Sequence, residues 1–314
     1  MRSGCAIQPM SNPLYNSTEC TMTKGEYVLI TAAYNEGTHI GATIDAVLMQ
    51  SVTPRKWVIV SDGSNDNTDA IIKRYAEQNN FIEYIRREKE GTLPGFVSKV
   101  YAIHTGFKAI SGTSYRFIGI LDADITFGSD YYERVIGKLQ EDKRLGIAGG
   151  FIYEPRVGVF KSRPSNTRAS VAGAIQLFRK ECYEAIGGHA PLPYGGEDWL
   201  CEILARKNGW TVMAFPDIVA YHHKPSEAKG EVFKDAIRQG KMDYSVASHP
   251  LFELVKCLRR VKERPFFLRA LFRLYGFTWS AIKGDSIAVS AEIANYLRQE
   301  QLVKIMMYIH RQHK

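Results

Sequence analysis

The chain has 314 residues, of which 45% are hydrophobic and 24% are charged, as is ordinary for a folded soluble protein with a sizeable core. It contains no run of 18 apolar residues, which argues against a helix that spans a membrane. Its five cysteines lack Cys-x-x-Cys spacing, which argues against a zinc site or a disulfide framework and favours reduced cytosolic thiols.

The net charge of +8 is concentrated in the last third of the chain. Residues 227–314 contain 16 lysines and arginines against 9 acids, whereas the preceding residues contain 25 basic and 24 acidic side chains. This asymmetry predicts a polyanionic surface as the partner of the C-terminal region. At the other end, residues 1–24 are polar and lack the apolar core of a secretory signal, so we expect a disordered segment there and a cytoplasmic protein.

From residue 26 onward, short β-rich runs alternate with helical patterns. The expected strands are 26–34, 56–62, 82–88, 115–124, 146–154 and 210–225. The expected helices are 38–51, 66–78, 97–110 and 194–209, and the run 174–188 fits a buried strand followed by a helix. The alternation with short connections predicts an α/β fold with a mostly parallel central sheet flanked by helices. After residue 225 the pattern is wholly helical, so we expect an α/β domain over 25–225 and a basic helical region over 226–314.

Two acids stand at the end of the expected strand 115–124. Asp122 and Asp124 would point to the same face of that strand, where they would repel each other unless a cation lay between them. Divalent cations prefer such oxygen ligands, although a solvated turn with two surface acids is the alternative. Asp62 also ends an expected strand, and ligands of open α/β sheets bind outside the carboxyl ends of the strands.

Five short segments, taken together, resemble a known family. They are TAAYNEG (31–37), VIVSDGSNDNT (58–68), ILDAD (120–124), GGEDW (195–199) and VAYHHKP (219–225). Their order and spacing over residues 26–225 are similar to those of family 2 glycosyltransferases, which have the Rossmann-like GT-A fold. The specificity lies in the agreement of five motifs, because each motif alone is weak.

The resemblance implies a nucleoside-diphosphate sugar as donor, first of all a UDP-sugar. The nucleotide would contact residues of the first two motifs, Lys99 and the D-x-D segment. These are Ala33, Tyr34, Glu36, Asp62, Lys99, Asp122, Ala123 and Asp124. Three alternatives stay open: Tyr34 as a rim aromatic, Asp62 as a turn-forming acid and Lys99 on a solvated helix face. Arg86 and Arg87 are expected to be exposed at the end of a strand.

The same resemblance implies a Mg²⁺ or Mn²⁺ ion held by Asp122 and Asp124 on the donor diphosphate, where a hard cation would stabilise the departing charge. His222 or His223 would complete the metal shell. Adjacent strand residues point to opposite faces, so at most one of them faces the metal, and we lean slightly to His223. The motif containing Glu197 and Asp198 implies that Asp198 is the general base of an inverting transfer. The alternative is a pair of acids that stabilises the N-terminus of a helix.

The segment 256–282 is basic and rich in aromatic residues. Phe267, Leu271, Leu274 and Thr278 share one helical face, and Lys262, Arg269 and Arg273 share another. Such a helix predicts peripheral contact with an anionic membrane, on the inner face of the cell membrane, although packing on the catalytic domain is the alternative. No recognition motif accompanies the charge, so we expect no nucleic acid partner.

The sequence thus predicts an inverting, metal-dependent glycosyltransferase acting on a glycan or lipid-linked acceptor. A nucleotidyltransferase on a similar fold would need a glycine-rich loop after the first strand, which AAYNEGTHIG does not supply. A pseudoenzyme that only binds a nucleotide sugar would have no use for the intact Asp198.

Overall fold

The computed structural model describes residues 26–89, 91, 93–224, 232–260 and 266–312, so the expected N-terminal segment 1–24 and Lys262 lie outside it. Within the described residues the strands are β1 (Tyr27–Ala33), β2 (Lys56–Asp62), β3 (Ile82–Arg87), β4 (Phe117–Leu121), β5 (Ile125–Phe127), β6 (Leu145–Arg156), β7 (Val159–Ser162), β8 (Ile175–Arg179) and β9 (Thr211–His222). They form one sheet in the order β3-β2-β1-β4-β8-β6-β9-β5, with β7 beside β6.

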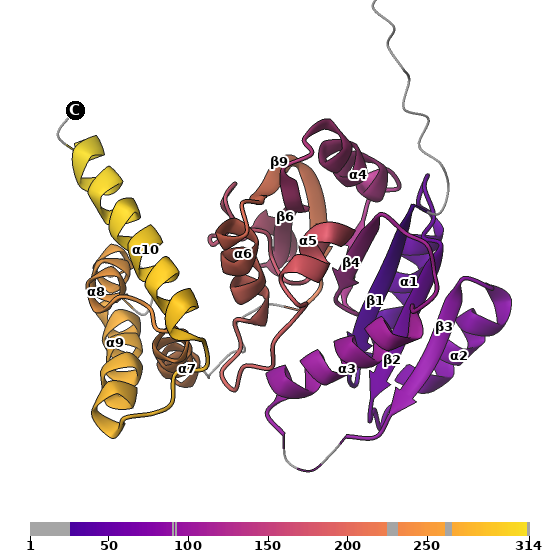
Figure 1. Ribbon diagram of the computed structural model, residues 1–314. Coiled ribbons are helices and arrows are strands. Elements are labelled where there is room, and N and C mark those ends of the chain that lie inside the picture. The colour runs from indigo at the N-terminus through magenta and orange to yellow at the C-terminus, as the bar shows by residue number, and fades with distance from the viewer. Residues whose placement is uncertain (1–25, 90, 92, 225–231, 261–265, 313–314) are drawn as a thin grey trace, which may run out of the picture.

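Along the first two thirds of the chain the helices alternate with the strands. The last four described helices follow one another without a strand between them. The helices are α1 (Ile40–Leu48), α2 (Thr68–Gln78), α3 (Gly95–Ala109), α4 (Tyr131–Glu141), α5 (Lys180–Ala185), α6 (Glu197–Lys207), α7 (Val232–Ser245), α8 (Pro250–Arg259), α9 (Phe266–Lys283) and α10 (Ala291–Gln312). Figure 1 shows α1 to α6 around the sheet and α7 to α10 as a separate helical layer beside α6. The expected α/β fold class is confirmed, including the helical C-terminal region.

The first four strands of the order, β3 to β4, are parallel to one another. Strands β1 and β4 are buried almost throughout, as expected for parallel strands covered by helices on both faces. The fit between helix and sheet is close. A Cβ on Gly106 of α3 would lie 2.6 Å from the Ile30 side chain of β1. This half of the sheet therefore aligns the carboxyl ends of β1, β2 and β4 along one edge.

The second half of the sheet is mixed. Strand β8 runs antiparallel to both β4 and β6, whereas β6 and β9 are parallel. The sequence pattern also missed α4 and the short strands β5 and β7. One expected boundary was wrong: β4 ends at Leu121, so Asp122 and Asp124 lie in the turn that leads to β5 and not on a strand. The two acids consequently have different neighbours.

The C-terminal helices share a small core with the segment before and within α6. Leu192, Leu200 and Ile203 pack with Val246 and Leu297 in one buried apolar cluster. Helices α7 and α9 are in close contact, because a Cβ on Gly240 would lie 2.0 Å from the carbonyl oxygen of Arg273. The helical region is therefore packed against the α/β part of the chain and is not a detached appendage.

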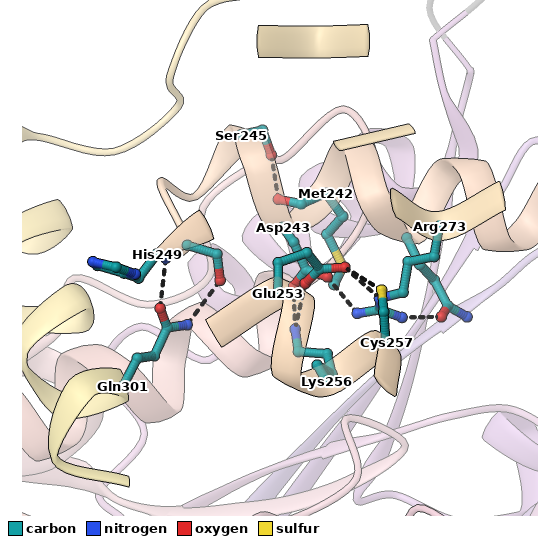
Figure 2. Close-up of polar contacts among 11 residues, drawn as sticks. Met242, Asp243, Ser245, His249, Glu253, Lys256, Cys257, Arg273 and Gln301 are labelled. Carbon is teal, nitrogen blue, oxygen red and sulfur yellow. Dashed lines mark hydrogen bonds and ion pairs between the residues drawn. The ribbon is translucent and has the colours of Figure 1, made fainter. Parts of the chain in front are cut away.

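A buried cluster of four charged side chains ties α7, α8 and α9 together (Figure 2). Lys256 Nζ lies 2.9 Å from Asp243 Oδ1, and Arg273 Nε lies 2.9 Å from Glu253 Oε1. Arg273 also donates to the other oxygen of Asp243 and is only 6% exposed. We expected Arg273 to lie on a basic helix face with Lys262 and Arg269. This expectation was wrong for Arg273, which is buried. Sequence periodicity could not show the two carboxylates that neighbouring helices bring to it.

Candidate active site

A cavity of about 210 Å³ lies beyond the carboxyl end of β4. It collects side chains from α3, the turn after β4, the segments around β7 and β8, the start of α6 and the end of β9. The lining residues are Phe96, Lys99, Ile103, Ile120, Asp122, Arg163, Gly173, Ala174, His189, Gly196, Glu197, Asp198 and His222. Three carboxylates from two separate sequence motifs, Asp122, Glu197 and Asp198, thus line one cavity.

Lys99 is the cation in the middle of these acids. Its Nζ lies 2.7 Å from Asp122 Oδ1, and its side chain is 29% exposed. Burial alone would lower the pKa of Lys99, but the carboxylates of Asp122, Glu197 and Asp198 raise it above its ordinary value. Lys99 therefore stays charged at neutral pH, and the alternative of a solvated helix face does not hold.

Asp124 is buried beside a histidine of β9. Its Oδ2 lies 3.2 Å from His222 Nε2, and the Nδ1 of that ring is 3.6 Å from Glu154 Oε1. Burial alone would lower the pKa of His222, but the carboxylates of Asp124 and Glu154 raise it to about 9. Burial works against ionisation of Asp124 as well, yet the contact with His222 lowers the pKa of Asp124.

His223 points elsewhere. Its Nε2 is 2.8 Å from Thr126 Oγ1, and its ring stacks on His39 with the ring centroids 5.8 Å apart. The imidazole beside the D-x-D acids is therefore that of His222, and the sequence-based leaning toward His223 is not supported by this geometry.

In the described part of the chain, no group of three His, Cys, Asp or Glu side chains could hold a metal ion by itself. The donor set that is present still fits one class of site. Mg²⁺ is usually bound by one or two carboxylates and substrate phosphates rather than by an all-protein cage. The buried Asp124, the neighbouring His222 and the half-exposed Asp122 match that pattern, with the remaining ligands left to a diphosphate.

The loop after β1 follows the buried Ala33 and begins with the half-exposed Tyr34, whose ring lies 4.1 Å from Lys89 Nζ. The Glu36 carboxylate pairs with Lys224, which follows β9. The backbone amide of Glu36 donates to Thr68 Oγ1 at 2.7 Å. Burial raises the pKa of the Glu36 carboxyl in spite of the lysine. The loop is thus tied to the end of β9, close to the D-x-D turn.

Asp62 ends β2 and is 4% exposed. It accepts hydrogen bonds from Arg87 at the end of β3 and from Ser98 of α3. Arg86 is the more exposed of the two arginines, with a side chain 38% exposed against 12% for Arg87. The expectation of exposure was therefore wrong for Arg87, because the parallel register of β2 and β3 sets it opposite Asp62.

Glu197 and Asp198 form the first turn of α6, which is preceded by Gly196 in the left-handed region at φ 91°. Asp198 Oδ2 accepts a hydrogen bond of 3.1 Å from the amide of Gly173, and its Oδ1 accepts one of 2.8 Å from the amide of Trp199. Glu197 is buried, and burial together with the charge of Asp198 raises the pKa of Glu197. The two acids therefore differ in environment although they are adjacent.

Sequence reasoning missed Arg163, Glu154 and His189. Arg163 follows β7 and reaches the cavity with its Nε 3.3 Å from Glu154 Oε1. His189 is buried in the cavity wall, and burial lowers the pKa of His189 to about 3, so its ring is neutral. These residues lie in none of the five motifs. The pairing of β6 with β7 brings Glu154 and Arg163 to the site, and the loop before α6 brings His189.

Most residues that line this cavity fall within a region that matches a known family model. The model of glycosyl transferase family 2 matches residues 28–195, which is more than half of the chain. This chain belongs to glycosyl transferase family 2. The match ends just before Gly196, so Glu197 and Asp198 lie immediately beyond it. The family that the five sequence motifs resemble is thereby confirmed.

Among curated proteins, the poly-beta-1,6-N-acetyl-D-glucosamine synthase of Staphylococcus aureus (strain COL) is 24% identical over 271 residues. The alignment covers 79% of this chain and 61% of the synthase. Two solved structures share the GT-A fold. The mannosyltransferase PcManGT from Pyrobaculum calidifontis, in complex with GDP-Man and Mn²⁺, has a TM-score of 0.53 at 19% identity and covers 90% of this chain and 81% of that one.

Residues 1–349 of S. aureus TarS, in complex with UDP-GlcNAc, have a TM-score of 0.52 at 17% identity and cover 87% of this chain and 78% of that one. These similarities establish the fold. Over the described residues, none of the helices combines the length and apolar character that crossing a bilayer requires.

Proposed function

We propose that this family 2 protein transfers a sugar, with inversion, from a nucleoside-diphosphate sugar to a hydroxyl group of a glycan or lipid-linked acceptor. The observation that carries the proposal is the convergence of Asp122, Glu197 and Asp198 on one cavity. A transfer of this kind needs charge stabilisation on the leaving-group side and a base on the acceptor side. The D-x-D turn and the start of α6 supply one each.

Asp198 is the proposed general base. Each of its oxygens accepts one backbone hydrogen bond, which fixes the carboxylate and leaves further lone pairs for an acceptor hydroxyl. Its neighbour Glu197 has a raised pKa and binds a proton more readily than an ordinary glutamate. In-line attack by the activated hydroxyl on the anomeric carbon then inverts the configuration.

Asp122, Asp124 and His222 are the residues that would hold Mg²⁺ or Mn²⁺ together with the donor diphosphate. When bound, the cation supplies Lewis acid stabilisation of the negative charge that grows on the leaving group. Lys99 and Arg163 add positive charge at the same cavity. Each is paired with a carboxylate, and a bound diphosphate would compete with that carboxylate for the cation. PcManGT was solved with Mn²⁺, which supports a divalent cation in a protein of similar fold.

The nucleoside would lie along the edge formed by the carboxyl ends of β1 and β2. Ala33, Tyr34 and Glu36 would line it on one side, and Asp62 with Arg87 on the other. We take a UDP-sugar as donor and an N-acetylhexosamine as the sugar to test first. TarS was solved with UDP-GlcNAc, and the curated relatives are named as synthases of an N-acetyl-D-glucosamine polymer.

The acceptor side includes a membrane surface in this proposal. Helix α9 presents a stripe of exposed apolar side chains at helical spacing, namely Phe267, Leu271, Tyr275, Trp279 and Ile282. The same helix carries Arg269 and Lys283, and the surrounding region has an excess of positive charge. An apolar stripe with basic neighbours is complementary to the headgroup region of an anionic membrane. We therefore propose a cytoplasmic enzyme with peripheral contact to the inner face of the membrane.

The proposal is tested by incubating the purified chain with Mn²⁺ and a panel of UDP- and GDP-sugars, and by measuring the nucleoside diphosphate released. Hydrolysis or transfer with one nucleotide sugar, abolished by EDTA, is the expected result. Tight nucleotide binding without turnover, with any acceptor glycan, would instead show the pseudoenzyme that the sequence left open. Release of pyrophosphate from a sugar phosphate and a nucleoside triphosphate would show a nucleotidyltransferase.

A further inference from the structure

The loop before the proposed base is held by a residue from the C-terminal helices. Arg238 of α7 donates through its Nη1 to the carbonyl oxygen of Tyr194 at 2.7 Å. Tyr194 is followed by Gly195 and Gly196, which lead directly into the first turn of α6. A single side chain from α7 therefore reaches the segment that presents Glu197 and Asp198.

The same guanidinium also lies over Phe96, a residue that lines the cavity. It lies 4.7 Å from the centre of the Phe96 ring, and Phe96 belongs to α3, one turn before Lys99. A guanidinium over an aromatic face is attracted by the ring quadrupole, and its planar fork donates in other directions at the same time. Arg238 thus bridges the base-bearing loop and the helix that carries the lysine of the site.

Arg238 is itself held in place. Its Nε donates to Asp235 Oδ1 at 3.1 Å, and Gln239 donates to Asp235 Oδ2 at 2.9 Å. The approach to the loop is close, because a Cβ on Gly195 would lie 3.1 Å from the Phe96 ring and 3.3 Å from Arg238 Nη1. Gly195 and Gly196 both adopt positive φ, at 84° and 91°. Glycine has little conformational preference of its own there, so the loop needs an external partner to fix it.

Met242, one turn further along α7, completes the support. A Cβ on Gly196 would lie 2.9 Å from Met242 Sδ, so α7 packs directly on the residue that precedes α6. Helix α7 is in turn fixed to α8 and α9 by the buried cluster that includes Asp243 (Figure 2). The C-terminal helices therefore support the loop that leads into α6 from behind.

We propose that Arg238 is a positioning residue that sets the place of Asp198 by clamping the Tyr194–Gly196 loop against α3. This inference rests on the proposed function of Asp198, but the clamp itself is a structural claim. Small displacements of a reacting group are costly, since a shift of about 1 Å can reduce a rate by roughly 100-fold. Removing the clamp should therefore reduce turnover more than it reduces donor binding.

The test compares Arg238→Gln and Arg238→Lys with wild type in the full chain. We expect Arg238→Gln to lower kcat for UDP-sugar turnover by about 10- to 100-fold, with the affinity for UDP changed less than about twofold. Arg238→Lys keeps a donor for the Tyr194 carbonyl and should recover part of the loss. The matched control is Arg134→Gln, because Arg134 of α4 pairs with Asp217 of β9 and neither residue lines the cavity.

Hydrogen exchange of the amides in residues 192–200 gives a readout that does not depend on activity. We expect faster exchange of this segment in Arg238→Gln and unchanged exchange in Arg134→Gln. Unchanged exchange in Arg238→Gln would overturn the clamp, as would a parallel loss of kcat, UDP affinity and melting temperature, which a general structural role predicts. If wild type turns over no nucleotide sugar, the proposed function fails, and the exchange experiment still decides the clamp.

Discussion

The amide of Gly173 donates a hydrogen bond of 3.1 Å to Asp198 Oδ2, which joins the loop before β8 to the start of α6. A Cβ at position 173 would lie 2.5 Å from the same oxygen, so only glycine allows this approach. Gln176 of β8 adds a hydrogen bond from its Nε2 to the backbone carbonyl of Asp198 at 3.3 Å. The proposed base is thus oriented by two residues that the sequence motif does not contain.

Replacing Asp198 by Asn should remove the base while keeping the shape of the side chain. We expect kcat for transfer to fall by about 10²- to 10⁴-fold, the usual contribution of general base catalysis. The affinity for UDP, measured by calorimetry, should stay within about twofold, because the nucleoside edge of the sheet is unchanged. Normal transfer by this variant would rule out the mechanism. In a separate single variant, Gly173→Ala should lower kcat as well.

The two adjacent histidines should differ in their effect on metal binding. We expect His222→Ala to weaken Mn²⁺ binding in the presence of UDP by about 10-fold or more, whereas His223→Ala should change it little. The reason is that His222 contacts Asp124, while His223 contacts Thr126 and His39. Electron paramagnetic resonance of Mn²⁺ titrations checks this, and equal losses in both variants would contradict it.

Glu202 should make stability depend on pH. Its carboxyl is buried in α6 and accepts a hydrogen bond of 2.6 Å from the amide of Val171, and burial raises the pKa of Glu202 to about 7. A raised carboxyl pKa means that the folded state binds a proton more tightly than the unfolded state. The stabilising contribution of the protonated Glu202 carboxyl is fully present below about pH 4.5. It is lost as the pH rises through about 7, which lowers the free energy of unfolding by about 3 kcal/mol.

Glu202→Gln keeps an oxygen for the Val171 amide and cannot ionise. We expect the variant to be more stable than wild type above pH 7 and to have a flatter stability profile between pH 5 and 8. Urea unfolding at a series of pH values measures the difference. An identical pH profile in the two proteins would show that Glu202 keeps its ordinary ionisation in the folded state.

Removing Arg273 should destabilise the helical region strongly. Arg273→Met leaves Asp243 and Glu253 buried with Lys256 as their remaining cation. Removing one partner of a buried ion pair lowers the free energy of unfolding by about 3–5 kcal/mol, so the urea midpoint should fall. Arg259→Met, at an exposed position of α8, is the control and should change the free energy of unfolding by less than about 0.5 kcal/mol.

The exposed stripe on α9 should mediate vesicle binding. We expect the protein to sediment with vesicles that contain anionic phosphatidylglycerol, less with purely zwitterionic vesicles, and less at high salt. The double substitution Leu271→Ser and Trp279→Ser should abolish sedimentation while leaving UDP binding intact. If the wild type instead forms a dimer that the same substitutions dissociate, the stripe is a contact between copies and the membrane proposal is wrong.

The sequence by itself determined the α/β fold class, the alternation of the first strands and helices, and the motifs of the site, although it did not predict α4, β5 or β7. These features depend on short stretches of sequence. Runs rich in β-branched residues, such as 56–62, form strands where they are buried. The motif acids lie at chain positions that a parallel sheet must bring to one edge. The extended strand expected through Asp124 was wrong, because no local signal distinguishes the last strand residue from the turn that follows it.

Tertiary structure alone decided which charges meet. Arg273 and Arg87 were expected at exposed positions, and both are paired with buried carboxylates that come from other elements. Glu154, Arg163 and Arg238 reach the site or its supporting loop only because β6, β7 and α7 fold back to it. The pairing energy of a charge depends on partners within a few ångströms and on their burial, and neither quantity is encoded by spacing along the chain.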